Sequence, residues 1–277
     1  MTTLNELIIL LQAGFVQRAF IIGIIVAILS SILSVFIVLK RVSLIGDGLS
    51  HTAFGGLALG YYLDIVPLWV AAVVVVLGSL GITRAIRSTR ISSDAAVAVF
   101  LQLGLSSGIV LISLARGFGI NIESLLFGSI LLVNVDQIII ASVILVAVLG
   151  VIFLFYKELV YTTFSETQAR ASGVQTWFFD YLIAALAGVV VIAAIPIVGV
   201  LLISALLVLP ALTSIQISRS FKQTILLSPV FGIASAFLGL FVSLILDIAS
   251  GATIVLTAMA IFIVVLGAKK IWTLQDD

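Results

Sequence analysis

Asp47 and His51 stand four residues apart within a long apolar stretch, and His51 is the only histidine in the chain. On a helix, residues with this spacing lie on one face with Cβ atoms about 5–6 Å apart, so both side chains can reach one cation. A carboxylate oxygen with an imidazole nitrogen suits Zn²⁺, Mn²⁺ or Fe²⁺. Two ligands are too few for these ions, so water, backbone carbonyls or a second copy of the chain must complete the coordination shell.

Two other interpretations of this pair stay open from its chemistry alone. Asp47 and His51 could form a hydrogen-bonded pair that neutralises itself inside a helix bundle, with Ser50 also engaged. They could also form a proton relay. The glycines around them would let helices approach closely in any of these cases, and they are Gly46, Gly48, Gly55, Gly56 and Gly60.

The composition indicates what kind of element carries the pair. Of 277 residues, 63% are hydrophobic and 9% are charged, whereas a soluble domain is about 45–50% apolar and about 25% charged. Apolar runs of about 15–25 residues favour membrane-spanning helices over the short alternating strands of a β-barrel. A net charge of +1 excludes a basic nucleic-acid surface, and the absence of cysteine excludes thiolate metal sites. We therefore predict an all-α polytopic membrane protein whose first partner is the lipid bilayer.

Charges and prolines divide the apolar sequence into about eight or nine transmembrane helices. The nine predicted spans are Ala19–Leu39, Leu44–Tyr62, Val66–Thr83, Ala95–Ala115, Ile138–Phe155, Trp177–Ile195, Val198–Ile217, Thr224–Leu246 and Ala252–Gly267.

The basic residues predict the orientation, because short cytoplasmic loops carry an excess of Lys and Arg. Alternating sides along nine spans leaves Arg18 and Arg116 on one side and the other eleven basic residues on the opposite side. This predicts an N-terminus outside the cell and a cytoplasmic C-terminus. The eleven are Lys40, Arg41, Arg84, Arg87, Arg90, Lys157, Arg170, Arg219, Lys222, Lys269 and Lys270.

The remaining segments are short, so we predict a single transmembrane domain over residues 1–277. Met1–Gln17 has the apolar periodicity of an interfacial amphipathic helix. The outer loop Arg116–Gln137 contains a short apolar segment and the polar residues Asn121, Glu123 and Asp136. The cytoplasmic loop of residues 156–175 contains Glu166 and Arg170, with Gly173 where a helix could end.

The stretch LKRVSLIGDGLSHTAFGGLALG at Leu39–Gly60 resembles the signature of the membrane permeases of zinc and manganese ABC importers. That signature is a basic pair followed by S-L-x-G-D-A-x-S-H and a glycine-rich continuation, and here Gly48 replaces the usual alanine. The runs FGSIL, SETQARASG, IPIVGVLLISALLVLPA and ASGATIVLTAM also resemble this family. The resemblance therefore extends over most of the chain.

The resemblance implies a type II importer with the helical plan of a vitamin B12 importer, in a bacterial cell membrane. It implies two copies of this permease, separate cytoplasmic ATP-binding subunits and an extracytoplasmic metal-binding protein, so that the chain itself is not an enzyme. Asp47 and His51 match the motif residues proposed to bind the transported Mn²⁺ or Zn²⁺, and no permanent cofactor is implied. Glu166, Arg170 and Gly173 match the loop that couples the permease to the ATPase.

Two alternatives come from other transport classes. A permease for an iron chelate or cobalamin shares the helical plan but usually lacks the histidine, so the spacing of Asp47 and His51 separates the two. A proton-coupled metal transporter would use Asp47 to carry the proton and would need no ATPase subunit.

Overall fold

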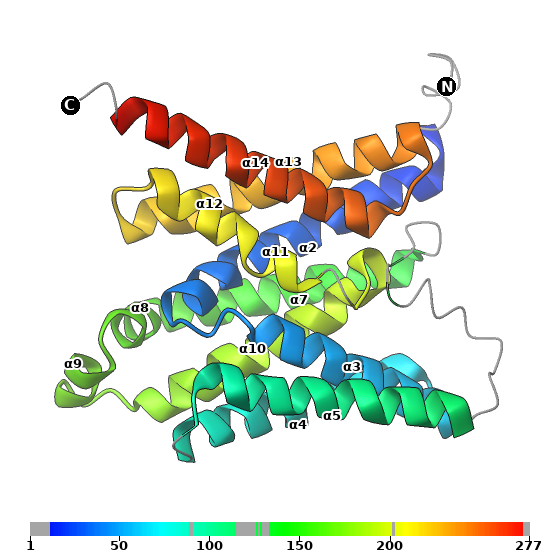
Figure 1. Ribbon diagram of the computed structural model, residues 1–277, viewed down its shortest axis with the longest axis horizontal. Coiled ribbons are helices and arrows are strands. Elements are labelled where there is room, and N and C mark those ends of the chain that lie inside the picture. The colour runs from blue at the N-terminus through cyan, green and yellow to red at the C-terminus, as the bar shows by residue number, and fades with distance from the viewer. Residues whose placement is uncertain are drawn as a thin grey trace.

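The computed structural model describes residues 12–88, 91–114, 126, 128, 133–200 and 203–273, and the regular structure in those ranges is helical (Figure 1). The helices are α2 (Gly14–Leu39), α3 (Ile45–Tyr62), α4 (Pro67–Ser88), α5 (Ser93–Leu114), α7 (Val135–Leu154), α8 (Tyr156–Phe164), α9 (Glu166–Ala171), α10 (Thr176–Val198), α11 (Ile203–Leu206), α12 (Leu209–Ile217), α13 (Phe221–Leu246) and α14 (Ser250–Thr273).

Each of the nine predicted spans corresponds to helical structure. Seven helices within the described residues are long and apolar enough to cross a membrane, which confirms an all-helical membrane architecture. The second predicted span, α3, is not one of these seven. It has 18 residues and is more polar than the seven, because it contains Asp47, His51 and several glycines. The predicted span 198–217 is broken into α11 and α12.

The helices form two outer groups with three helices between them (Figure 1). One group is α3, α4 and α5, and the other is α12, α13 and α14. Helices α2, α7 and α10 lie between the groups; α10 contacts both of them, and α2 packs on α12 and α13. Helix α2 begins at the end of the bundle opposite to that where α14 ends.

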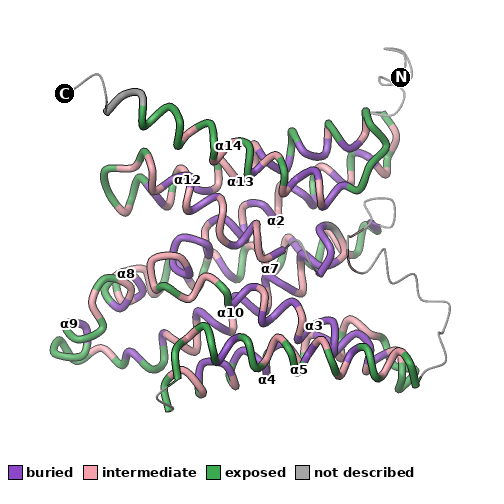
Figure 2. Tube along the Cα trace, viewed as in Figure 1, coloured by how far each residue is buried: buried purple, intermediate pink, exposed green. Residues whose placement is uncertain are grey.

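Buried residues are concentrated on α2, α3 and α10 (Figure 2). Helices α7 and α13 expose large apolar side chains: Phe153 is 86% exposed and Leu226 is 71% exposed. A soluble protein rarely exposes a contiguous surface of this kind. Lipid is the solvent that suits these faces, as the composition predicts.

A side chain of α2 forms hydrogen bonds with backbone groups at the break between α11 and α12. The Ser34 hydroxyl accepts a hydrogen bond from the Ala211 amide (3.3 Å) and donates one to the Val208 carbonyl (3.4 Å). Pro210 lies in the first turn of α12, where its missing N–H costs little. Because unsatisfied backbone groups are costly in the membrane, an interruption of this kind requires such a partner.

Two loop predictions fall largely outside the described residues. The predicted interfacial helix Met1–Gln17 is described only from residue 12, and α2 begins at Gly14, so residues 14–17 belong to the first long helix. Asn121 and Glu123 of the outer loop are outside the described ranges. Asp136 lies in the first turn of α7, which Asn134 and Gln137 cap.

Candidate functional site

Asp47 and His51 lie on one face of α3, as their spacing predicts. Asp47 is in the first turn, where the positive end of the helix dipole favours a carboxylate. Both residues are only partly buried in this chain, whereas the residues between them and the seven that follow His51 are buried. The structure thus leaves the face that carries Asp47 and His51 incompletely covered.

No direct hydrogen bond joins the two side chains in the described part of the chain. In the described part of the chain, the ion pairs do not include one between Asp47 and His51. The Nδ1 atom of His51 is buried and has no hydrogen-bond partner there. The Ser50 hydroxyl donates to the Asp47 backbone carbonyl (3.0 Å), not to either side chain. The arrangement therefore lacks the direct hydrogen bond that a self-neutralising pair would make.

A single chain does not bring together a full set of metal ligands here. Across the described ranges, no group of three or more His, Cys, Asp or Glu side chains is placed to hold a metal ion. Asp47 and His51 supply two ligands, whereas first-row divalent ions take about four to six.

Close backbone packing against α4 and α5 fixes the position of α3 along its axis and its rotation about that axis. A Cβ atom at Gly104 of α5 would lie 2.4 Å from the His51 carbonyl oxygen, and one at Gly55 of α3 would lie 2.8 Å from the Gly104 carbonyl oxygen. On the other side, a Cβ atom at Gly56 would lie 2.7 Å from the Cα atom of Ala71 in α4. Small residues allow this approach in a membrane, where close van der Waals packing drives helix association.

The broken helix also lies beside the first turn of α3. A Cβ atom at Gly46 would lie 3.2 Å from the Cα atom of Ser204 in α11. Asp47 therefore stands next to the segment in which the predicted span 198–217 is interrupted.

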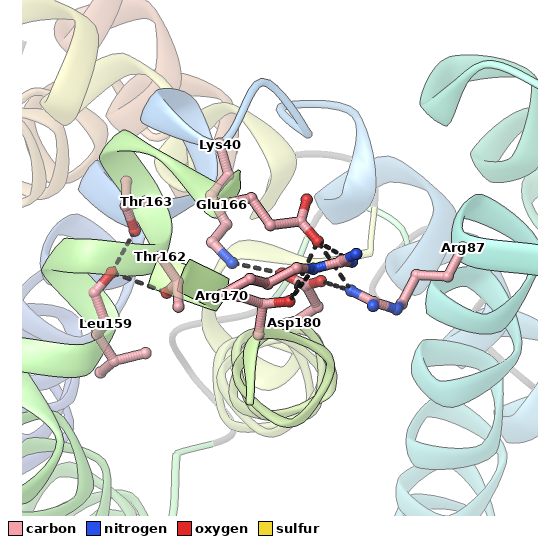
Figure 3. Close-up of polar contacts among 9 residues, drawn as sticks. Lys40, Arg87, Leu159, Thr162, Thr163, Glu166, Arg170 and Asp180 are labelled. Atoms are coloured by element: carbon pink, nitrogen blue, oxygen red, sulfur yellow. Dashed lines mark hydrogen bonds and ion pairs between the residues drawn. The ribbon is translucent and has the colours of Figure 1, made fainter. Parts of the chain in front are cut away.

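A second group of polar side chains comes together where α2 and α4 end (Figure 3). We call Lys40, Arg87, Glu166, Arg170 and Asp180 the charged cluster. Asp180 of α10 pairs through Oδ1 with Lys40 Nζ (2.5 Å) and through Oδ2 with Arg87 Nη1. Glu166 Oε1 pairs with Arg170 Nη2 (2.5 Å) and with Arg87 Nη1 (3.5 Å). Arg87 thus connects the two carboxylates.

The predicted loop of residues 156–175 contains two short helices, α8 and α9, and local capping explains the second. The Ser165 hydroxyl accepts from the Gln168 amide (3.3 Å) at the start of α9. Gly173 has φ +84° just after the end of α9, and the Val174 amide donates to the Ala169 carbonyl (3.0 Å). This is the Schellman pattern, in which glycine adopts the left-handed conformation without strain. The prediction that Gly173 ends a helix is confirmed.

Glu166 is held in its ionised form by its neighbours. Partial burial alone would raise the pKa of this carboxyl. Hydrogen bonds from Arg170 and Thr176, together with the charges of Arg170 and Arg87, outweigh that effect and bring the pKa of Glu166 below its usual value. Glu166 therefore fastens α9 to the first turn of α10 at neutral pH.

We expect Glu166→Gln to lower the apparent melting temperature at pH 7 by roughly 1–3 °C, because half-exposed ion pairs contribute little. A carboxyl with a lowered pKa stabilises the folded state above its unfolded pKa and loses that contribution as the pH falls through its folded pKa. The difference between Glu166→Gln and wild type should therefore disappear below about pH 4. Thermal unfolding at both pH values measures it, with Glu158→Gln of α8 as the matched control. A difference that persists unchanged at low pH would contradict this account.

A cleft of about 670 Å³ connects the charged cluster with the start of α3. All five residues of the cluster line this cleft. Arg41 and Val42 of the turn before α3, and Ile45 in its first turn, line it as well. The cleft therefore reaches to within two residues of Asp47.

The structure places the predicted site residues in two separate groups. Asp47 and His51 share one face, and Glu166, Arg170 and Gly173 belong to α9 and its C-terminal turn. Sequence reasoning missed Asp180, which joins Lys40 and Arg87. The sequence does contain a signal for it: an acidic residue near the start of an apolar span needs a partner of opposite charge.

Comparison with known proteins agrees with this architecture. The profile of the ABC 3 transport family matches residues 12–269. The manganese transport system membrane protein MntC of Listeria innocua is 33% identical over 92% of this chain and 91% of its own length. The manganese import system permease protein ScaB of Streptococcus gordonii is 36% identical over 90% of each chain.

Solved structures show the same fold. PsaBC from Streptococcus pneumoniae, solved in complex with Fab, superposes with a TM-score of 0.85 at 34% identity over 95% of both chains. A putative metal-chelate type ABC transporter in an inward-facing conformation gives a TM-score of 0.66 at 16% identity over 97% of this chain and 90% of that one, which is a likeness of fold alone. Because the profile covers nearly all of the described helices, the chain belongs to the ABC 3 transport family.

Proposed function

We propose that this chain is the transmembrane permease of an ATP-binding-cassette importer for divalent transition metal ions, with Mn²⁺ as the favoured ion. One observation carries the choice of ion class: Asp47 and His51 share an incompletely covered face of α3, and the buried Nδ1 of His51 has no partner among the described residues. Relatives that the chain matches over most of its length are named as manganese transport permeases. This supports Mn²⁺ over Zn²⁺.

The proposed assembly has two copies of this chain. Each copy contributes Asp47 and His51, and together they supply the four protein ligands that one copy lacks. Separate cytoplasmic subunits bind and hydrolyse ATP, and an extracytoplasmic metal-binding protein delivers the ion. The permease itself performs no covalent chemistry.

In the proposed orientation, the N-terminus is outside and the C-terminus is cytoplasmic. The excess of basic residues on one side supports it, as does the meeting of Lys40, Arg87 and Arg170 at one end of the bundle. The single permease domain then follows the type II plan, with residues 156–175 facing the ATPase. Glu166, Arg170 and Gly173 shape the short helix α9 that contacts it.

Transport proceeds by alternating access. ATP binding draws the cytoplasmic subunits together, α8 and α9 move with them, and the helices around α3 open the ion path to the other side. The cleft beside Ile45 and Arg41 would give the ion a route from Asp47 to the cytoplasm.

The test is uptake by the complete transporter in proteoliposomes, with radiolabelled Mn²⁺ and Zn²⁺, an iron chelate and cobalamin as substrates. We expect ATP-dependent uptake of Mn²⁺ and none of cobalamin or the chelate. Uptake that needs a proton gradient but no ATPase would instead support the proton-coupled transporter. Uptake of the chelate or cobalamin would move the protein to the other importer class.

A further inference from the structure

Asp180 is the residue at which three helices of the charged cluster meet. It lies in the second turn of α10, and its two carboxylate oxygens pair with different cations. Lys40 is the C-cap residue of α2, and Arg87 lies in the last turn of α4. A single side chain therefore ties the ends of α2 and α4 to α10 (Figure 3).

The burial of these contacts separates them from ordinary surface ion pairs. The side chains of Lys40 and Asp180 are 11% and 23% exposed, and that of Arg87 is 25% exposed. If Asp180 loses its charge, Lys40 loses its ion-pair partner, and Arg87 keeps only the longer contact to Glu166. Two largely buried cations would then repel each other, and the ends of α2 and α4 would separate.

The contacts continue from Asp180 to α9 in one direction. Arg87 Nη1 reaches Glu166, which also accepts hydrogen bonds from Arg170 and from Thr176 of α10. A displacement of α9 therefore pulls on Arg87 and on the first turn of α10 together.

In the other direction the contacts continue to the metal-site helix. Only four residues separate Lys40 from the start of α3, and α4 packs on α3 along its length. At Gly78 of α4, a Cβ atom would lie 2.7 Å from the Cγ2 atom of Thr52, the residue after His51. Packing this close transmits a rigid-body shift of α4 instead of absorbing it.

Resting on the proposed function, we propose that Asp180 is a positioning residue that couples the movement of α9 to the Asp47–His51 site. By holding Lys40 and Arg87 together, it makes the cytoplasmic ends of α2, α4 and α10 move as one unit with α9. Asp180 contacts neither the ion nor ATP, and its effect is on how many ions are transported for each ATP hydrolysed.

The experiment compares Asp180→Asn with wild type in the complete transporter, measuring Mn²⁺ uptake and ATP hydrolysis in the same proteoliposomes. We expect the variant to hydrolyse ATP but to transport at least about fivefold fewer ions per ATP, the lower limit of typical coupling effects. Asp180→Glu keeps the charge and should restore most of the ratio. Asp94→Asn, an exposed carboxylate in the first turn of α5, is the matched control and should leave the ratio unchanged.

A wild-type ratio in Asp180→Asn would overturn the proposal, and so would equal losses in Asp180→Asn and Asp180→Glu. If Asp180→Asn does not assemble, Lys40→Gln and Arg87→Gln each remove one partner and should both lower the ratio. Wild-type ratios in both would overturn the proposal as well.

Equilibrium binding of Mn²⁺ to the purified permease separates this proposal from the function on which it rests. Asp180→Asn should bind Mn²⁺ as wild type does, because Asp180 is not a ligand, and weakened binding would overturn its positioning role. If wild type binds no Mn²⁺, the proposed function fails. The coupling role is then measured as the stimulation of ATP hydrolysis by the extracytoplasmic binding protein. Asp180→Asn should abolish this stimulation and Asp94→Asn should retain it. Retained stimulation in Asp180→Asn would overturn the coupling role.

Discussion

His51→Ala should lower ATP-driven Mn²⁺ uptake by at least about 10–100-fold, the range in which even outer-shell changes weaken metal sites. In the proposed assembly the substitution removes two of the four protein ligands, one from each copy. Asp47→Ala should have a comparable effect, because it removes the other two and leaves a cation without a compensating charge in the membrane. ATP hydrolysis and assembly should persist, since neither side chain pairs with another described residue.

The measurement is initial uptake at matched membrane abundance, together with Mn²⁺ binding by calorimetry in detergent. Thr257→Ala is the control, because its hydroxyl donates only within α14, to the Thr253 carbonyl. The single imidazole gives a direct readout: bound Mn²⁺ should protect His51 from carbethoxylation. Normal uptake in both variants would make the pair structural and move the search to Asp136 and the outer loop.

Gly104→Ala is the second large effect that we expect. The added Cβ atom would lie 2.4 Å from the His51 carbonyl oxygen, and its nearest neighbours are all backbone atoms of His51 and Thr52, which cannot turn away as a side chain could. Overpacking of this kind costs about 1–3 kcal/mol, so the apparent melting temperature should fall by about 3–10 °C. Uptake should fall with it, because α5 can yield only by moving away from the helix that carries His51.

Gly150→Ala provides the matched control for this prediction. Gly150 is in α7, and nothing lies within 4 Å of a Cβ atom built there. Alanine favours a helix over glycine by about 1 kcal/mol, so this variant should be as stable as wild type or more so. If Gly104→Ala unfolds at the wild-type temperature, or Gly150→Ala is equally destabilised, close packing at Gly104 is not what holds α3.

The helices could be predicted from the sequence because each span must satisfy its own backbone in lipid and is therefore long, apolar and bounded by charges. Their interruptions were harder to predict. Val198–Ile217 carries no charged residue, and only Gly199 and Pro210 signal that its helix is broken. The hydroxyl that satisfies the break belongs to Ser34, on another helix, and no local pattern shows that contact.

The candidate metal site could be predicted because its two residues are neighbours on one helix. Asp180 could not be assigned in the same way, since Lys40 lies 140 residues away and Arg87 lies 93 residues away along the chain. Contacts at such separations depend on how α2, α4 and α10 pack. In the proposed assembly the remaining metal ligands come from a second copy, so neither one sequence nor one chain could predict them.

The contact between Ser34 and the α11–α12 break has a consequence for how the protein is made. The Ala211 amide and the Ser34 hydroxyl are 177 residues apart, and α2 leaves the ribosome first. Until α2 is beside it, the interrupted segment carries backbone groups that lipid cannot satisfy. The break is therefore fully satisfied only after the later segment has met α2, which makes α2 an internal template for a late stage of biogenesis.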